Sequence, residues 1–231
     1  EIIVIMHEYY LSLALNEAQK RRGFCAPNPS VGAVLIKDQQ IIASGNHYQC
    51  GDAHAEVDAI RKAGDAANGA TLYVTLEPCS HLNKKTPPCT QLIIEKNICQ
   101  VIYAYKDPNP DVDGVKILKE AGIDCQYFPI EAINDFYCSY SYWWQTKKPF
   151  ITAKLAMSLD AKIAGEHGKP LVITHLAAKE FTHQQRKITD AILTTATTIK
   201  NDDPLLNARI DQEVYTKKIF ILDTQLSIPT S

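Results

Sequence analysis

The sequence predicts a layered α/β fold built around a mostly parallel sheet. Segments with apolar residues at helical spacing alternate with short strand-forming runs from residue 8 to residue 128, which is typical of such a sandwich. The run at 71–77 is apolar and stops at a proline, as a buried strand does. The expected helices are residues 8–22, 54–67, 89–97 and 114–121, and the expected strands are residues 31–37, 41–44, 71–77, 99–105 and 124–128.

Local signals place the ends of these elements. The first helix presents one apolar face and stops at Gly23, and the second ends near Asn68-Gly69. Two strands flank the turn Asp38-Gln39-Gln40 and are expected to pair. The apolar positions that define the two helices are Leu11, Ala14, Leu15 and Ala18 in the first, and Val57, Ile60 and Ala63 in the second.

A second unit is expected to begin near residue 147. Residues 131–146 are predicted to be helical and are crowded with tyrosine and tryptophan, which favours burial against a neighbouring surface over stacking on a ligand. Residues 147–149, which include a proline, then separate this helical segment from a new strand that is predicted at residues 150–156. This unit has few elements, and we expect it to be part of a larger domain. Its other expected elements are a helix at 175–187 and strands at 190–194 and 218–223.

Composition narrows the class of protein. The 231 residues are 45% hydrophobic and 22% charged, which excludes a collagen, a coiled coil and wholesale disorder. A formal net charge of −2 argues against a protein whose main function is to bind nucleic acid. No apolar stretch is long enough for a membrane span. The N-terminus lacks the pattern of a secretory signal, and seven cysteines are not a disulfide framework. We therefore expect a cytoplasmic protein.

Three short motifs carry residues that suit a metal site: His54-Ala55-Glu56, Pro78-Cys79 and Pro87-Pro88-Cys89. Each stands at the start of an expected helix, where free backbone N–H groups and a partial positive charge stabilise a thiolate. Two thiolates and an imidazole suit zinc, and three protein ligands leave the fourth position to water. Zinc lowers the pKa of such a water to about 7, and Glu56 is placed to carry its proton to a leaving amine.

Two other interpretations of these motifs remain open. His81 lies two residues beyond Cys79, and as a fourth ligand it would make the zinc structural, but Glu56 would then have no role. In the other interpretation, the protein is a binding module without catalytic activity, and zinc only stabilises its fold. Replacement of Glu56 by glutamine distinguishes an enzyme from such a module.

The combination resembles the zinc nucleobase deaminases, whose pattern is H-x-E followed by P-C-x-x-C. Nine residues separate Cys79 from Cys89 here, where the general pattern has two. That longer spacer is similar to the deaminase domain of the bifunctional riboflavin-biosynthesis deaminase/reductase family, although the loop is one residue longer and lacks the family's glycine. The other stretches that follow the family are 28–32, 72–79 and 107–110. The stretches 154–160, 191–193 and 198–206 resemble its reductase domain.

The resemblance implies a three-layer α/β/α, cytidine-deaminase-like domain at 6–146, followed at 147–231 by an incomplete dihydrofolate-reductase-like α/β domain, the N-terminal part of a reductase that uses NADPH. The implied reaction is zinc-dependent hydrolytic deamination of 2,5-diamino-6-ribosylamino-4(3H)-pyrimidinone 5′-phosphate in riboflavin biosynthesis. A complete second domain would then reduce the ribose side chain. A zinc deaminase of nucleic acid or of a nucleoside such as cytidine or adenosine is the alternative. The family also implies a homo-oligomer whose partner is a small phosphorylated pyrimidine.

Matching the family's motifs also implies roles for single residues of the first domain. The implied zinc ligands are His54, Cys79 and Cys89, with Glu56 as the catalytic proton shuttle. The implied substrate contacts are Asn28, His47, His81, Asp107 and Asn109, and either Lys84 or Lys85 is placed to meet the phosphate.

The same matching implies contacts in the second domain. Pro170 and Val172 stand where the family usually has a serine and a tryptophan, so polar and stacking contacts are expected to be missing there. The implied NADP contacts are Ala156, Val172, Thr198 and Asp202, and the implied substrate contacts are Arg186, Leu206 and Arg209.

Overall fold

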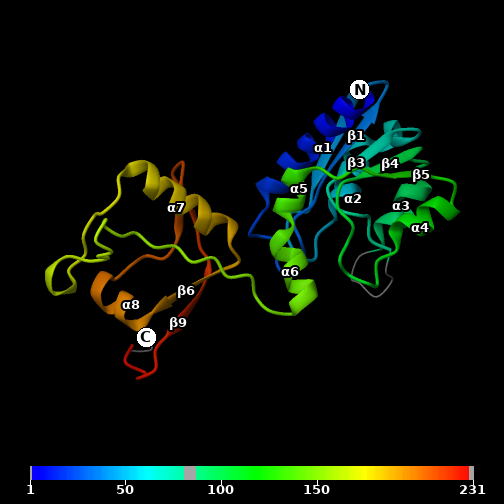
Figure 1. The fold of residues 1–231 in the computed structure, drawn as a ribbon. Helices are drawn as coiled ribbons and strands as arrows, with labels where there is room; N and C mark the ends of the chain where they lie inside the picture. The colour runs from blue at the N-terminus through cyan, green and yellow to red at the C-terminus, as the bar shows by residue number, and fades with distance from the viewer. Residues whose placement is uncertain (1, 81–86, 229–231) are drawn as a thin grey trace. The chain divides into compact units, whose positions relative to one another are not determined.

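A computed structural model describes residues 2–80 and 87–228 of the chain (Figure 1). The chain separates into two units, residues 1–150 and residues 151–231. Among the helices of the described residues, none has both the length and the apolar character that crossing a membrane requires.

The first unit is organised by one five-stranded sheet in the order β2-β1-β3-β4-β5. β1 runs antiparallel to both β2 and β3, whereas β3, β4 and β5 are mutually parallel. The carboxyl ends of β3 and β4 therefore lie at the same edge of the sheet, where α/β folds commonly place their sites. The strands are β1 (Gly32–Lys37), β2 (Gln40–Asn46), β3 (Thr71–Val74), β4 (Gln100–Tyr103) and β5 (Asp124–Tyr127).

Helices cover both faces of this sheet and complete three layers (Figure 1). Alternate residues of β1 face opposite layers, because a strand has a side-chain period of two. Ala33 and Leu35 pack with α2, α3 and α4, while Val34 and Ile36 pack with α1 and α5. The helices are α1 (Ile2–Lys20), α2 (Ala55–Ala63), the 3-10 helix η1 (Gly64–Ala67), α3 (Cys89–Glu95), α4 (Gly114–Glu120), α5 (Glu131–Phe136) and α6 (Cys138–Thr146).

The predicted α/β/α architecture is confirmed, and one of the expected strands is wrong. The segment 131–146 is helical as expected, and it is divided into two helices because the chain turns at Tyr137, whose side chain is 1% exposed. The strand expected at 150–156 is not formed in the described residues. A strand exists only where a neighbour pairs with it, and the described strands of the second unit pair among themselves.

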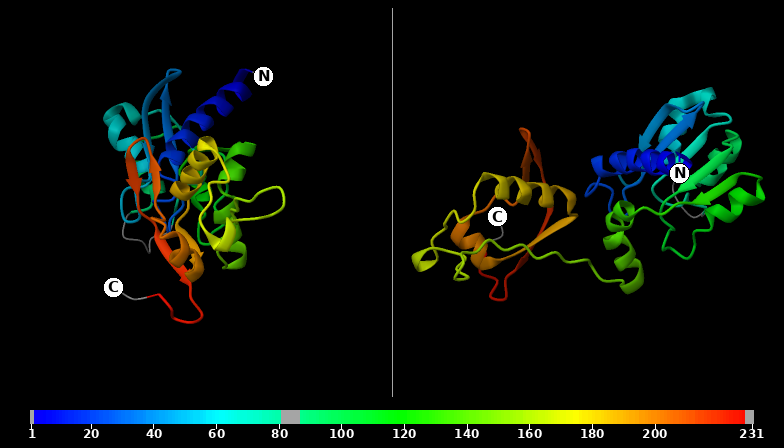
Figure 2. Two further views of the ribbon diagram at one scale, coloured as in Figure 1. Left: turned by 90° about the vertical axis from the view of Figure 1, so that its left-hand side faces the viewer. Right: turned by 45° about the horizontal axis from the view of Figure 1, so that its top comes forward.

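The second unit contains two separate pairs of strands. β6 and β9 are parallel. β7 and β8 form an antiparallel hairpin, and α7 packs against β7 (Figure 2). Nδ1 of the buried His183 on α7 accepts the N–H of Arg209 on β7 at 3.1 Å. The elements are η2 (Glu166–Gly168), α7 (Leu176–Ile188), β6 (Ala191–Thr195), α8 (Ala196–Asp202), β7 (Ala208–Ile210), β8 (Glu213–Tyr215) and β9 (Lys218–Leu222).

A chain of buried hydrogen bonds ties the turn at Tyr137 to the sheet. The N–H of Gly32 donates to Oγ1 of Thr75 (3.2 Å), and the hydroxyl of Tyr137 donates to the carbonyl of Ser30 (2.9 Å). Because that carbonyl only accepts, the Thr75 hydroxyl is the donor in its 2.6 Å contact with the Tyr137 hydroxyl. The three bonds run in one direction and connect the start of β1, the end of β3 and the start of α6.

Replacing Tyr137 by phenylalanine is expected to lower the free energy of unfolding by about 1–3 kcal/mol, because the Ser30 carbonyl and the Thr75 hydroxyl lose their buried partner. Urea unfolding followed by circular dichroism measures this. The same substitution at the exposed Tyr142 serves as the control and is expected to change stability by less than about 0.5 kcal/mol. Equal stability of the Tyr137→Phe variant and the unmodified protein would contradict the role of the hydrogen-bond chain.

Candidate active site

Three segments that are distant in the sequence bring a histidine and two cysteines together. His54 caps the N-terminus of α2, and Cys89 is the first residue of α3. Cys79 follows β3, and the expectation that it stands at the start of a helix is wrong for the described residues. His54 Nδ1 lies 3.2 Å from Cys89 Sγ and 3.4 Å from Cys79 Sγ, and the two sulfur atoms are 3.5 Å apart. The three atoms form a nearly equilateral triangle, and they are the group in the described residues that is suited to hold a metal ion.

The dimensions of this triangle fit zinc. Zinc bonds of about 2.0 Å to nitrogen and about 2.3 Å to sulfur, at tetrahedral angles, require about 3.5 Å between nitrogen and sulfur and about 3.8 Å between the sulfur atoms. The distances in the structure are shorter than these by no more than about 0.3 Å. One imidazole and two thiolates are also the donor set that zinc favours.

The start of α3 favours a thiolate at Cys79. The backbone N–H of Cys89 points at Cys79 Sγ over 3.4 Å, as expected for an unpaired donor in the first turn of a helix. A hydrogen bond from the Cys89 thiol lowers the pKa of Cys79 well below its usual range, and the same contact raises the pKa of Cys89. Without a cation, one proton therefore stays on the sulfur pair.

Glu56 lies beside the triangle, in the first turn of α2. Its side chain is 3% exposed, and burial raises the pKa of its carboxyl to about 7, although the imidazole of His54 opposes the shift. A carboxyl with a pKa near neutrality both accepts and returns a proton at physiological pH. This placement is that of a proton shuttle next to a metal.

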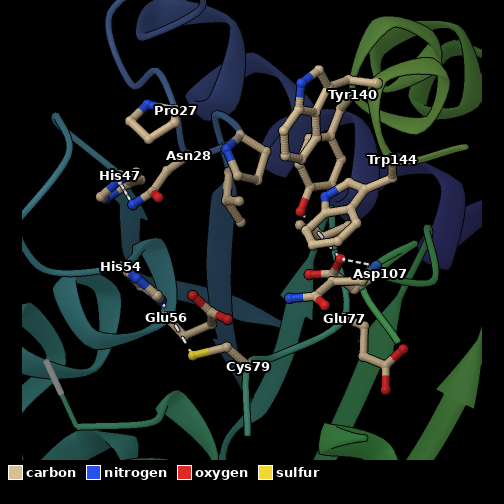
Figure 3. A pocket seen from close by; sticks show the side chains of 15 residues that line it. Pro27, Asn28, His47, His54, Glu56, Glu77, Cys79, Asp107, Tyr140 and Trp144 are labelled. Carbon is tan, nitrogen blue, oxygen red and sulfur yellow. Dashed lines mark hydrogen bonds between the residues drawn. The ribbon is translucent and has the colours of Figure 1, made fainter. Parts of the chain in front are cut away.

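A pocket of about 230 Å³ opens in front of the triangle and is lined by His54, Glu56 and Cys79 (Figure 3). Asn28 and His47 line it from the segment before β1 and from the end of β2. Nδ1 of His47 donates to the carbonyl of Ala53 (3.0 Å), so its Nε2 accepts the side-chain amide of Asn28 (3.1 Å). The pair is thus held in a defined orientation toward the pocket.

The turn after β4 supplies another part of the lining. Asp107 Oδ1 accepts the backbone N–H of Asn109 (2.9 Å) and the hydroxyl of Tyr140 (3.2 Å). Both Asp107 and Asn109 line the pocket. The turn is therefore held both by hydrogen bonds within itself and by one from α6.

The structure brings most of the site residues expected in the first domain together. His54, Cys79 and Cys89 form the triangle, and Cys89 lies fully buried behind the pocket. Of the expected substrate contacts, His81 lies outside the described residues, as do Lys84 and Lys85. The expected residues that line the pocket are Asn28, His47, His54, Glu56, Cys79, Asp107 and Asn109.

In the second unit, the expected substrate residues surround Asn207. Arg186 donates to its carbonyl (3.2 Å) and Arg209 to its side-chain oxygen (2.9 Å), while Leu206 is buried next to it in the chain.

The residues expected to contact NADP lie on two different segments of the second unit. Thr198 and Asp202 are both on α8, and the N–H of Thr198 donates to Oγ1 of Thr195 at the start of that helix. Ala156 and Val172 lie in the irregular segment before α7, where the side chain of Val172 is 90% exposed.

The lining residues that were not among the site residues expected from the sequence include Glu77, Tyr140, Trp143 and Trp144. Burial raises the pKa of Glu77, which accepts the N–H of Val115 (3.2 Å) at the start of α4. The density of aromatic residues in α6 was the available signal, and it favoured burial. Tyr137 is buried as that interpretation requires, but Trp143 is 45% exposed, and α6 itself has no fully buried residue.

Comparison with known proteins finds a matching family model for each of the two units. A family model described as the cytidine and deoxycytidylate deaminase zinc-binding region matches residues 5–105, and the RibD C-terminal domain matches residues 149–231. The riboflavin biosynthesis protein RibD of Bacillus amyloliquefaciens is 44% identical over 97% of this chain, and that of Aquifex aeolicus is 41% identical over 96%. The chain belongs to the RibD family. The resemblance expected from the motifs is thereby confirmed.

Solved RibD structures have the same fold. Acinetobacter baumannii RibD superposes with a TM-score of 0.88 at 36% identity, covering 98% of this chain and 65% of that one. A diaminohydroxyphosphoribosylaminopyrimidine deaminase/5-amino-6-(5-phosphoribosylamino)uracil reductase from Thermotoga maritima has a TM-score of 0.88 at 39% identity, covering 96% of this chain and 64% of that one. The chain spans 61% and 63% of the length of the two curated relatives.

Gly114→Ala is expected to weaken zinc binding at least tenfold without removing a ligand, because a Cβ at Gly114 would overlap the carbonyl of Pro78 and displace Cys79. Competition with a chromogenic chelator measures the affinity. Gly32→Ala is the matched control, since its Cβ would overlap the carbonyl of Ala14 on the other face of the sheet. It is expected to reduce stability while the folded fraction keeps its zinc affinity. Equal zinc affinities of the two variants would contradict this packing argument.

Proposed function

We propose that the first unit, assigned to residues 6–146, is a zinc-dependent deaminase acting on 2,5-diamino-6-ribosylamino-4(3H)-pyrimidinone 5′-phosphate in riboflavin biosynthesis. The observation that carries this proposal is a buried Glu56 beside the His54–Cys79–Cys89 triangle, facing a pocket large enough for one heterocycle. The similarity to riboflavin-biosynthesis proteins over nearly the whole chain supports this choice of substrate.

His54, Cys79 and Cys89 would hold the zinc. When bound, zinc supplies the Lewis acidity that makes water a competent nucleophile at neutral pH. Glu56 would take one proton from the attacking water and pass it to the neighbouring ring nitrogen, and would then pass the second proton, from the hydroxyl on C2, to the departing amino group. A C–O bond forms at C2 and the C–N bond breaks, so the amine leaves as ammonia.

The other lining groups bind and orient the substrate in this proposal. Asn28 and His47 offer a fixed pair of polar groups to the pyrimidine, and Asp107 and Asn109 meet the ribosyl side from the turn after β4. His81 and either Lys84 or Lys85 are proposed to complete the contacts, with a lysine on the phosphate.

The second unit, assigned to residues 147–231, is proposed to be the N-terminal part of a reductase domain that uses NADPH. The proposed NADPH contacts are Ala156, Val172, Thr198 and Asp202. Two guanidinium groups meet at Asn207, so Arg186 and Arg209, with Leu206 between them in the sequence, suit a phosphorylated substrate. We further propose a homo-oligomer in the cytoplasm, a compartment that agrees with seven cysteines and no disulfide bond among the described residues.

The substrate is tested by ammonia release. The zinc-loaded protein is expected to release ammonia from the diaminopyrimidine ribosyl phosphate at least 100-fold faster than from cytidine or cytidine monophosphate. A coupled glutamate dehydrogenase assay measures the rate. A preference for cytidine would favour the nucleoside deaminase alternative, and tight salt-dependent binding of single-stranded nucleic acid would favour a nucleic-acid deaminase.

Glu56→Gln is expected to lower kcat by about 10²- to 10⁴-fold, because the amide does not carry the proton. Zinc content, measured by plasma mass spectrometry, is expected to stay at one ion per chain, and the circular dichroism spectrum to stay unchanged. The matched control is Glu95→Gln, which alters an exposed carboxylate on α3 and is expected to retain full activity. Full activity of the Glu56→Gln variant, or an unmodified protein purified without zinc, would contradict the mechanism.

A further inference from the structure

We propose that α6 forms an aromatic subsite of the pocket, in which Trp144, supported by Tyr140, stacks against the planar ring of the substrate. The identity of that ring as an aminopyrimidine rests on the proposed function. The existence of an aromatic subsite rests on the geometry of α6 alone.

A row of aromatic rings runs along α6 from its N-cap to the pocket, which Tyr140, Trp143 and Trp144 line. Tyr137, Tyr140 and Trp144 are spaced by three and four residues, so they lie on the same side of the helix. Their rings touch in sequence, with centroids 6.3 Å apart between Tyr137 and Tyr140 and 6.5 Å apart between Tyr140 and Trp144. Tyr137 is fixed in the core by its two hydrogen bonds, so the row of rings begins at a rigid point.

Tyr140 connects this row to the polar side of the pocket. Its hydroxyl donates to Oδ1 of Asp107 (3.2 Å), in the turn that is proposed to meet the ribosyl group. Figure 3 shows Tyr140 and Trp144 across the pocket from His54, Glu56 and Cys79. A ring bound between the two sides would present its reacting carbon to the metal ligands and its π-face or edge to the indole.

Trp144 is held in place by its neighbours on α6. The ammonium of Lys147 lies 3.6 Å from the centroid of its ring, and Trp143 meets it edge-on with centroids 5.1 Å apart. Lys147 ends the helix in a left-handed conformation, with its N–H donating to the carbonyl of Trp143 (2.7 Å). Because these contacts restrict the indole before a ligand arrives, stacking costs little additional side-chain entropy.

The chemistry of the two sides of the pocket is complementary to an aminopyrimidine. The polar side carries the residues that would hold zinc and the carboxyl of Glu56, which would exchange protons with the ring nitrogen and the exocyclic amino group. The aromatic side offers a surface that any planar heterocycle covers favourably. Loss of one base–aromatic stack by alanine substitution weakens binding of a nucleobase by roughly 5- to 150-fold.

Tryptophan fluorescence tests the subsite directly, because the only two tryptophans of the chain are Trp143 and Trp144. The zinc-loaded Glu56→Gln variant is titrated with the diaminopyrimidine ribosyl phosphate, so that binding is seen without turnover. A Trp143→Phe change in that background, which leaves Trp144 as the sole indole, is expected to keep ligand-dependent quenching. A Trp144→Phe change is expected to lose most of it. Ribose 5-phosphate, which lacks the ring, is expected to quench neither.

Steady-state kinetics provide the second readout. Trp144→Ala is expected to raise KM about 5- to 150-fold with kcat changed less than about threefold, and Trp144→Phe to restore KM to within a few-fold of the unmodified value. Tyr142→Ala is the control on the same helix, since Tyr142 packs on Phe150 and does not line the pocket. It is expected to leave both constants unchanged.

The outcomes separate the subsite from the proposed function. Normal deamination with an unchanged KM in Trp144→Ala and no quenching of Trp144 would overturn the subsite and leave the function standing. Absence of deamination, combined with quenching of Trp144 by cytidine monophosphate, would overturn the function and support the subsite. Absence of both deamination and quenching by any of these compounds would overturn both.

Discussion

The close approach of three metal-binding atoms governs the chemistry of this protein. Two cysteine sulfurs and an imidazole nitrogen lie 3.2–3.5 Å apart, and the carboxyl of Glu56 lies beside them, almost without solvent exposure. Several negatively charged groups at such distances are unfavourable in a buried site. Without a cation, Cys89 therefore keeps its proton, and near neutral pH a large fraction of the Glu56 carboxyl groups are protonated. A divalent cation removes that conflict, which is why the arrangement is intelligible as a metal site.

Backbone packing brings these atoms together. β2 lies so close to α2 that a Cβ at Gly45 would overlap the carbonyl of Ala55, and that contact sets the position of the helix that carries His54 and Glu56. Gly114 allows an equally close approach of α4 to Pro78, the residue before Cys79. Parallel pairing of β3 and β4 brings the Cys79 segment and the Asp107 turn to the same edge. The polar site is thus a consequence of how closely helices approach the sheet.

The sequence predicts the layers and the metal residues because both leave local signatures. Period-two and helical apolar patterns are retained wherever one face of an element is buried, and H-x-E with two Pro-Cys pairs is a specific set of residue types. The aromatic side of the pocket was not predicted. Tyr137 and Tyr140 look alike in the sequence, and only tertiary contacts decide that Tyr137 is buried in the core while Tyr140 lines the pocket. The missing strand at 150–156 has a similar origin, since strand propensity without a pairing neighbour does not produce a strand.

The charge of the pocket favours a small ligand over a polynucleotide. Within the described part of the chain, the lining includes the acidic residues Glu56, Glu77 and Asp107 and neither lysine nor arginine. A nucleic-acid deaminase needs a positively charged track for successive phosphates, and the overall charge of −2 offers no general compensation. A single terminal phosphate requires only one cationic contact, which Lys84 or Lys85 is proposed to supply. Polar contacts at the reacting carbon, an aromatic surface for the ring and one cation for the phosphate are together the demands of a single phosphorylated heterocycle.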